Sequence, residues 1–364
     1  MPVRLITGKD CVLSSGKELK KLGSRCLIVS GRTAARRSGA LDDVIAALDE
    51  NGQEHILFDS IGQNPLLTDC MAASEKAIVF GADFVVGIGG GSALDAAKCI
   101  AVLAANPGMT REQLYAFDWA NAPLKIAAVG TTAGTGSEVT KVAVITTPDG
   151  RKKSFHHELI FPAVSFGDAK YTMSLPEKIT RSTAVDVLAH CAESYFSRAA
   201  NHISQLYAVE GIKLLIPVFR SFIENGYDEI TFEMREALYC ASIYGGLAIN
   251  VTGTAFPHTM GYLLTEKFAI PHGTACAVFQ KEFYAYNKSV EPELAAEFLV
   301  RIGCGEEEYL DMIDAITPSC DIEMTEELIS ASHSRWIGNG SIAKCRGEFT
   351  ADMADEILRK KFVK

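Results

Sequence analysis

The sequence lacks any apolar run that approaches the ~18 residues that a membrane-spanning helix needs. Its first residues, Met1 to Val12, also lack the charged segment followed by an apolar one that marks a secretion signal. No internal repeat, low-complexity tract or long linker rich in proline and serine interrupts the chain. We therefore expect a soluble, cytoplasmic protein with no membrane partner.

Positive charge is also scarce. Lysine and arginine total 35 against 45 for aspartate and glutamate, so the formal net charge is −10. Nucleic acids and anionic membranes attract basic surfaces, and this balance therefore disfavours both as partners. With 48% hydrophobic and 22% charged residues among 364, the chain is too apolar to be disordered and is long enough for two domains.

The ten cysteines include no C-x-x-C pair, which disfavours a cysteine-based metal site and a disulfide framework. Most lie in apolar surroundings such as Leu-Tyr-Cys-Ala (238–241) and Thr-Ala-Cys-Ala (274–277). A thiol in such a place acts as a small core residue. We predict reduced cysteines that pack in the core.

In the first half of the chain, short β-branched runs alternate with helical periodicity. The pattern predicts strands at 26–30, 54–58, 84–88 and 125–129, helices at 38–51, 67–81 and 93–105, and a hairpin of 141–147 and 153–157. Strands that alternate with helices favour a parallel sheet. We predict an α/β, Rossmann-like domain over residues 1–172.

The second half changes to a period of 3.6 with few strand signals. Helices are predicted at 179–197, 204–225, 231–250, 275–287, 293–302, 306–316, 325–333 and 350–362. We therefore predict an all-α domain over residues 173–364.

Three consecutive glycines, Gly89 to Gly91, separate an expected buried strand from an expected helix. Glycines let the backbone approach a ligand closely, and N–H groups at a helix start favour an anion. The spacing is not the G-x-G-x-x-G fingerprint, and a tight strand-to-helix turn is the alternative. A second loop, TTAGTGS (131–137), also follows a strand. Two such loops at the carboxyl edge of a parallel sheet together predict a nucleotide site.

The helical half contains one aspartate and three histidines in a pattern that suits a metal site. Asp186 and His190 lie four residues apart on one face of an expected helix, and His258 and His272 follow further along. One Asp and three His suit Fe²⁺ or Zn²⁺ in a Lewis-acid site. The alternatives are an ordinary hydrogen-bonded helical pair for the first two residues and satisfied core histidines for the others.

Taken together, these motifs resemble the iron-containing (group III) alcohol dehydrogenases. The segments that carry the resemblance are GGGSALDAAK (89–98), TTAGTGSEVT (131–140), D-x-x-x-H (186–190), FPHTMGY (256–262) and PHGTA (271–275), in the family's order. The resemblance implies an N-terminal dinucleotide-binding domain, a C-terminal helical metal-binding domain and a homodimer. It implies reversible hydride transfer between a small primary alcohol and NAD(P)⁺, with Fe²⁺, or Zn²⁺ as the alternative, as a Lewis acid.

By position, the resemblance makes Asp186, His190, His258 and His272 the metal ligands, which act in catalysis through the metal. The residues that it assigns to the cofactor are Asn64, Gly90, Gly91, Ser92, Asp95, Thr131, Thr132, Thr135, Lys152, Tyr171 and Thr172, with Lys153 as an alternative to Lys152. Tyr262 departs from the family, because several members carry a second histidine there. The alternative functions are a related metal- and NAD-dependent cyclase, such as a dehydroquinate synthase, and a nucleotide-binding sensor without turnover.

Cofactor choice depends on the residue after the strand at 26–30. NAD-preferring members of the resembled family commonly carry an aspartate there, which binds the ribose hydroxyl and repels a 2′-phosphate. This chain has Gly31, followed by Arg32 and Thr33, which offer donors to a phosphate. Arg36 and Arg37 add positive charge, or else coat a solvated helix end. We predict NADP as the cofactor, with NAD as the alternative.

Overall fold

The structure, a computed structural model, describes residues 2–363. The chain divides into two compact units, of which the first ends at Leu175 and the second begins at Pro176. The first unit is an α/β unit built on a parallel sheet, and the second is helical, which confirms the predicted fold class. Each unit is described by itself below.

The first unit holds the mixed α/β elements in chain order. They are β1 (Arg4–Thr7), α1 (Cys11–Ser14), α2 (Lys17–Lys20), β2 (Arg25–Ser30), α3 (Ala34–Arg37), α4 (Ala40–Glu50), β3 (Glu54–Phe58), α5 (Leu67–Phe80), β4 (Phe84–Gly89), α6 (Gly91–Ala105), α7 (Arg111–Ala116), β5 (Lys125–Gly130), β6 (Val142–Thr146), β7 (Lys152–His156) and β8 (Val164–Gly167).

Six strands form one sheet in the order β1-β8-β5-β4-β2-β3, and all its pairs are parallel. Strands β6 and β7 form a separate antiparallel pair, as the hairpin prediction requires. From β2 the chain adds β3 on one side, whereas β4 pairs with β2 on the other side and β5 follows beyond it. The strand order therefore reverses between β2 and β4, and open α/β sheets bind ligands at such a switch point.

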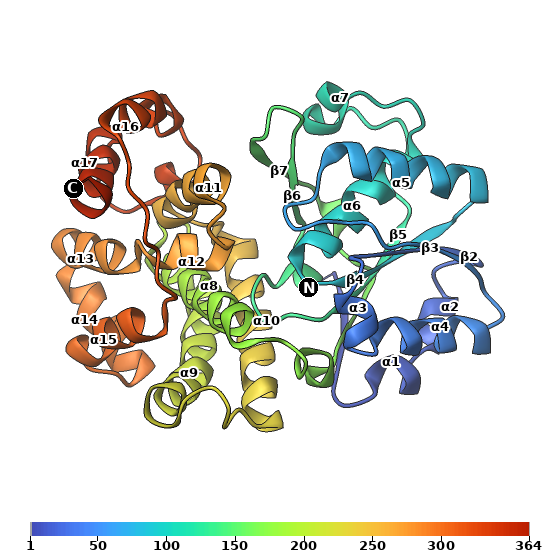
Figure 1. Cartoon of the computed structure of the whole chain (residues 1–364), viewed down its shortest axis with the longest axis horizontal. Helices are drawn as coiled ribbons and strands as arrows, with labels where there is room; N and C mark the ends of the chain where they lie inside the picture. Colours follow the sequence, from blue (N-terminus) through green and yellow to red (C-terminus); the bar gives the residue numbers. More distant parts are fainter. Residues whose placement is uncertain (1, 364) are drawn as a thin grey trace. The chain divides into compact units, whose positions relative to one another are not determined.

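Alternate residues of the strands face opposite sides of the sheet, and helices bury both faces. Leu27 and Val29 of β2 pack in a cluster with α5 and α6, whereas Ile28 packs with α1 and α4. Figure 1 shows α5 and α6 on one side of the strands and α1 and α4 on the other. Because both faces are buried, the central strands read as continuous apolar runs, which is why the sequence predicts them well.

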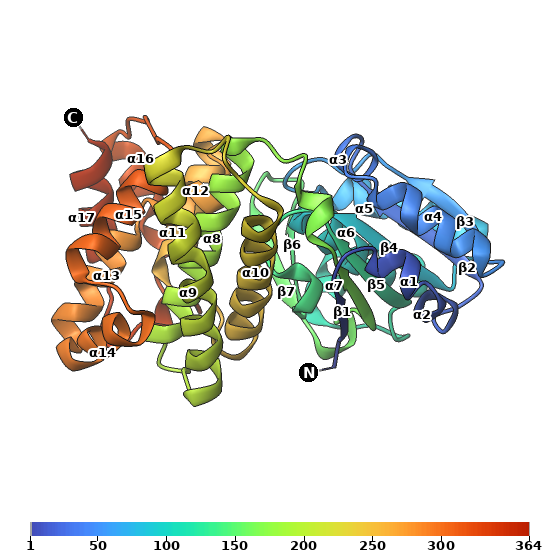
Figure 2. The ribbon, with the colours of Figure 1, turned by 90° about the horizontal axis from the view of Figure 1, so that it is seen from below.

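The second unit consists of helices. They are α8 (Glu177–Phe196), α9 (His202–Asn225), α10 (Phe232–Thr252), α11 (Phe256–Phe268), α12 (His272–Ala277), α13 (Gln280–Val290), α14 (Pro292–Ile302), α15 (Glu306–Ile316), α16 (Glu326–Ser332) and α17 (Ala351–Phe362). The long helices α8, α9 and α10 pack against one another (Figure 2). In residues 2–363, no helix is both long and apolar enough to cross a membrane.

The helix predicted at 275–287 is wrong in its bounds. The chain instead forms α12 from His272, leaves the helix at Val278 and Phe279, and starts α13 at Gln280. Pro271 precedes α12 in an extended conformation and fixes where it starts. This early start places His272 in the first turn of a helix, where its ring can meet residues of α8 and α11.

Candidate functional site

Three helices of the second unit bring the predicted metal ligands together. Asp186 and His190 lie one turn apart on α8, His258 lies near the start of α11, and His272 opens α12. Glycines allow the helices to approach closely. A Cβ atom built on Gly261 would lie 3.0 Å from the backbone of α12, and one on Gly273 would lie 1.9 Å from a backbone oxygen of α8. Residue 273 therefore excludes a side chain, and a side chain at residue 261 would be tightly packed against α12.

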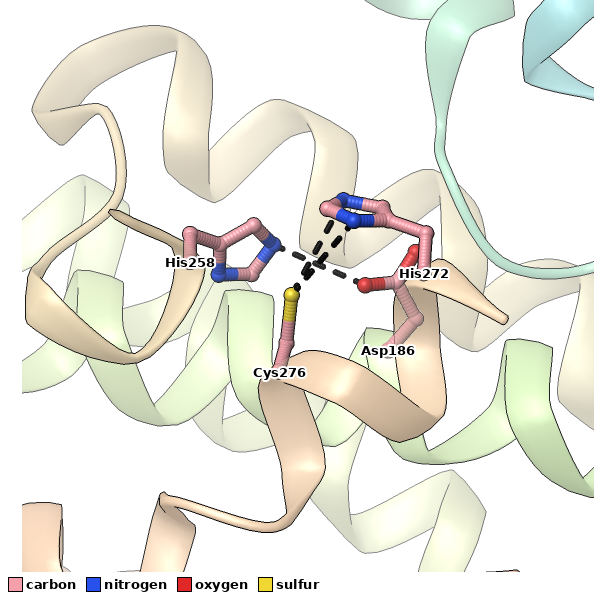
Figure 3. A group of neighbouring side chains, drawn as sticks. All are labelled: Asp186, His258, His272 and Cys276. Carbon is pink, nitrogen blue, oxygen red and sulfur yellow. Dashed lines mark hydrogen bonds and ion pairs between the residues drawn. The ribbon is translucent and has the colours of Figure 1, made fainter. Parts of the chain in front are cut away.

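The donor atoms form a compact group (Figure 3). One donor atom each from Asp186, His258, His272 and Cys276 lies within 4.8 Å of all the others. His190 adjoins the group, because its Nε2 lies 3.9 Å from Oδ1 of Asp186 and its ring stacks on that of His258, with centroids 4.7 Å apart. The three predicted histidines therefore surround one buried carboxylate.

The charges in this group fit a cation. Oδ1 of Asp186 and Nε2 of His258 face each other 3.5 Å apart, and neither atom makes a hydrogen bond within the described residues. Burial alone would raise the pKa of Asp186, but the neighbouring histidines hold it well below its ordinary value. Burial would lower the pKa of His258, but Cys276, Glu193 and Asp186 raise it well above its ordinary value. The group thus stabilises positive charge, which a divalent metal supplies.

Cys276 is the donor that the sequence analysis missed. All ten cysteines are free, as predicted, and Cys276 is buried. Its thiol, however, is no ordinary core group, since Sγ lies 3.7 and 3.8 Å from the two ring nitrogens of His272. The spacing of four residues between His272 and Cys276 within one helix is the signal that could have found it.

Tyr262 takes the place of the second histidine that several members of the resembled family carry. Its ring stacks on that of His272, with centroids 5.3 Å apart and an angle of 12° between the planes. The ring of Tyr262 therefore packs against one face of the His272 imidazole and restricts its orientation.

In the first unit, the two predicted phosphate loops pack against each other. They leave neighbouring strands at the same level, since Gly89 of β4 pairs with Gly130 of β5. A Cβ atom on Gly90 would lie 2.8 Å from the side chain of Thr132, and one on Gly91 would lie 2.7 Å from that of Thr135. Larger residues would push the loops apart.

Positive φ occurs at Gly89, where φ is +152°, and Gly90 and Gly91 have no such value. Gly90 caps α6, so the N–H groups of the first turn of α6 begin directly at the glycine loop. The side chain of Thr131 is buried there, and its Oγ1 makes no hydrogen bond within residues 2–363. Loop and helix start together have the geometry of an anion site.

Asn64, Ser92 and Lys152 come together beside the glycine loop. Asn64 adopts a left-handed conformation with φ of +56°, its N–H donates to Oγ of Ser92 at 3.3 Å, and its Oδ1 accepts from Nζ of Lys152 at 3.1 Å. Lys153 points elsewhere, with Nζ 4.2 Å from the ring centre of Tyr115. The geometry therefore favours Lys152 over Lys153 as the lysine near the cofactor.

The side chains of three predicted cofactor residues form hydrogen bonds with other residues of the first unit. Asp95 accepts hydrogen bonds from Oγ of Ser137 at 2.6 Å and from the N–H of Val144 at 2.9 Å. The other two are buried: the hydroxyl of Tyr171 donates to Asp43, and that of Thr172 donates to the carbonyl of Ala169. Their cofactor roles remain predictions.

The segment after β2 lies beside the switch point, because Ser30 pairs with Ile88 of β4. Gly31 and Arg32 follow it, and the side chain of Arg36 pairs with Asp59 at 3.2 Å. No carboxylate directly follows β2, so the position that reads the ribose in the resembled family carries no negative charge.

Comparison with known proteins assigns the family. A family model described as "Iron-containing alcohol dehydrogenase" matches residues 2–169, and one described as "Fe-containing alcohol dehydrogenase family, C-terminal" matches residues 180–328. The chain belongs to the iron-containing alcohol dehydrogenase family. The resemblance inferred from the motifs is therefore confirmed across both units.

Individual known proteins resemble the chain over most of its length. Alcohol dehydrogenase 4 of Schizosaccharomyces pombe is 31% identical over 314 residues, which cover 85% of this chain and 74% of that protein. An iron-containing alcohol dehydrogenase from Thermotoga maritima has a crystal structure that matches with a TM-score of 0.91, 30% identity and coverage of 99% and 98% of the two chains. Sulfoacetaldehyde reductase from Bifidobacterium kashiwanohense, in complex with NAD⁺, matches with a TM-score of 0.86, 28% identity and coverage of 99% and 96%.

Proposed function

We propose that the chain is a metal-dependent alcohol dehydrogenase and aldehyde reductase that exchanges hydride between a small primary alcohol and NADP. Asp186, His190, His258 and His272 would hold Fe²⁺, or Zn²⁺ as the alternative. The observation that carries the proposal is the buried carboxylate oxygen of Asp186, which faces Nε2 of His258 at 3.5 Å with no hydrogen bond on either atom within the described residues. A cation between these atoms satisfies both.

When bound, the metal supplies Lewis-acid polarisation of the substrate oxygen, and the nicotinamide carries the hydride. The residues of this chain position the metal and the cofactor. Asp186 and the imidazoles would hold the metal, and Tyr262 supports the ring of His272 by stacking. The glycine loop offers the start of α6 to the pyrophosphate, and Lys152 with Asn64 lies beside that loop.

The proposal of NADP rests on Gly31. Without a carboxylate after β2, nothing at that position repels a 2′-phosphate, and Arg32 and Thr33 offer donors to it. The structure of the Bifidobacterium relative contains NAD⁺, so NAD is the alternative cofactor for this chain. The family models that match the two units both describe alcohol dehydrogenases. We therefore do not propose the cyclase or the nucleotide-binding sensor without turnover. The expected homodimer remains a prediction.

The function is tested by metal analysis of protein purified without air, joined to a panel of small aldehydes with NADPH and with NADH. We expect bound iron or zinc and net oxidation of NADPH by at least one aldehyde. Metal-free, inactive protein that fails to regain activity with either ion would contradict the proposal.

The variants His272→Ala and Asp186→Ala assign the ligands. Each should abolish metal binding and turnover, because each removes a donor from the group. Both should leave NADPH affinity largely intact, because the glycine loop belongs to the other unit. Full metal content and activity in either variant would remove that residue from the ligand set.

A further inference from the structure

Glu193 is a fully buried carboxylate next to the metal centre to which no role has been assigned so far. It follows His190 by three residues on α8, so Asp186, His190 and Glu193 occupy one side of the helix. A buried charge costs several kcal/mol unless partners compensate it. The partners that compensate the charge of Glu193 therefore indicate what this residue does.

Three donors surround the carboxylate. The backbone N–H of Ala255 donates to Oε2 at 2.6 Å, Nε2 of Gln280 donates to Oε1 at 3.1 Å, and Nδ1 of His258 lies 2.7 Å from Oε1. In the part of the chain that the structure describes, the only ion pair of Glu193 is the one with His258. All three neighbours can satisfy an acceptor, and an ionised carboxylate accepts only.

This arrangement favours the tautomer of His258 that carries its proton on Nδ1. An ionised carboxylate at Glu193 accepts from Nδ1–H, and a neutral ring with that tautomer has its lone pair on Nε2. That lone pair points at Oδ1 of Asp186, the direction in which the donor group converges (Figure 3). Two such acceptors that face each other at 3.5 Å need a positive charge between them, which a proton supplies in the metal-free protein and a bound metal ion would supply in its place.

We propose that Glu193 is a positioning residue of the metal centre: it holds His258 in the tautomer and orientation that bind metal through Nε2, and adds a buried negative charge behind the ligand. Partners of this kind are known to orient metal-binding histidines and to raise their basicity. The proposal rests on the proposed metal binding. Glu193 touches the ligand and not the reacting atoms.

The alternative is a purely structural role, since Ala255 precedes α11 and its N–H needs an acceptor. The variant Glu193→Gln separates the two roles. Its size and shape are preserved and one oxygen remains for a donor, but the NH₂ group must face another donor and the charge is lost. A structural role would lower stability without a specific loss of metal affinity.

The test is a Zn²⁺ titration of metal-free protein in competition with a chromogenic chelator. We expect Glu193→Gln to bind Zn²⁺ about 10- to 100-fold more weakly than wild type. The matched control is Glu266→Gln, which removes a largely buried carboxylate of α11 that pairs with Arg335. The control should bind Zn²⁺ as wild type does, and both variants should keep the NADPH affinity.

The outcomes separate the two proposals. Equal Zn²⁺ affinities of wild type, Glu193→Gln and Glu266→Gln would overturn the role of Glu193 and leave the proposed function standing. Wild type that binds neither Zn²⁺ nor, in the same assay without air, Fe²⁺ would overturn both. Should Glu193→Gln not fold, ¹⁵N-histidine NMR of Zn²⁺-loaded wild type decides, with His258 expected as the Nδ1–H tautomer. An Nε2–H tautomer of His258 would overturn the proposal.

Discussion

Gly273 lies against the backbone of Ser182, so close that a Cβ atom on Gly273 would lie 1.9 Å from the carbonyl oxygen of Ser182 and 2.8 Å from Cβ of Asp186. The next residue, Thr274, donates to Oγ of Ser182 through both its N–H, at 3.2 Å, and its hydroxyl, at 3.1 Å. These contacts dock the helix of His272 onto the helix of Asp186. The absence of a side chain at residue 273 is therefore required for the geometry of the candidate metal site.

The first prediction is that Gly273→Ala separates α12 from α8. The added methyl group meets backbone, which cannot rotate away, so we expect a loss of stability of about 3 kcal/mol or more and loss of metal binding. Thermal unfolding and a Zn²⁺ titration measure both effects. Gly340→Ala is the control, because a Cβ atom there meets nothing within 4 Å. Wild-type behaviour of Gly273→Ala would contradict the docking role.

The fold follows from the sequence where local patterns suffice. The run CLIV at 26–29 is apolar throughout, and it lies in β2 with both faces buried. By contrast, β1 with Arg4 to Thr7 has only four residues, no fully buried one, and pairs with β8 from far along the chain. Such a short edge strand has no local signature, and its pairing decides its structure.

The candidate metal site is also predictable only where its residues lie close together in the sequence. Asp186 and His190 share one helix, so spacing alone indicates their juxtaposition. The contacts of Glu193 come from residues 255, 258 and 280 on other segments, and only the tertiary structure brings them together. The proximity of Cys276 to the ring of His272 was missed for a different reason: the two residues lie four apart, but the spacing indicates contact only once the helix is known to start at His272.

The second prediction is that Gly91→Val weakens cofactor binding. The Cβ atom would lie 2.7 Å from Cγ2 of Thr135, so the β-branched side chain forces the glycine loop away from the threonine loop. We expect a loss of NADPH affinity of about tenfold or more, equal to about 1.4 kcal/mol or more, measured by fluorescence titration. Gly340→Val should bind as wild type. Unchanged affinity in a folded Gly91→Val would refute the prediction.

The third prediction concerns cofactor choice. Wild type should have a higher kcat/KM with NADPH than with NADH, and Gly31→Asp should reduce the NADPH/NADH ratio by about tenfold or reverse it, because a carboxylate repels the 2′-phosphate. A Cβ atom at residue 31 would lie 3.2 Å from the carbonyl oxygen of Ile61, so crowding must be separated from charge.

Gly31→Asn makes that separation, because it has the size of aspartate without its charge. It should keep more of the NADPH preference than Gly31→Asp does. An equal or better kcat/KM with NADH in the unmodified enzyme would show that the missing carboxylate does not decide the choice.

Lys98 is a fully buried lysine of α6 that reaches the loop at 131–137 and the residues that follow it. Its Nζ donates to Oγ of Ser137 at 2.7 Å, to the carbonyl of Val142 at 2.8 Å and to Oγ1 of Thr140 at 3.2 Å. Oγ of Ser137 in turn donates to Oδ1 of Asp95. Burial lowers the pKa of Lys98 from 10.5 to about 8, although Asp95 and Glu138 oppose this shift.

The fourth prediction follows from the sign of that shift. Between pH 8 and 10.5, Lys98 is neutral in the folded protein and still protonated in the unfolded chain, so the unfolded state binds one more proton and stability from this group rises with pH. Below pH 8 both states are protonated, and the contribution is constant. Relative to Lys98→Met, wild type should therefore gain up to about 1.4 kcal/mol per pH unit in this range, or about 2 °C in Tm for a chain of 364 residues. Melting curves of both proteins at several pH values measure the difference, and comparison with Lys360→Met, at an exposed lysine of α17, removes effects common to any lost lysine. A Tm difference that stays flat or falls as the pH rises would mean that Lys98 keeps its proton in the folded protein, held there by Asp95 and Ser137.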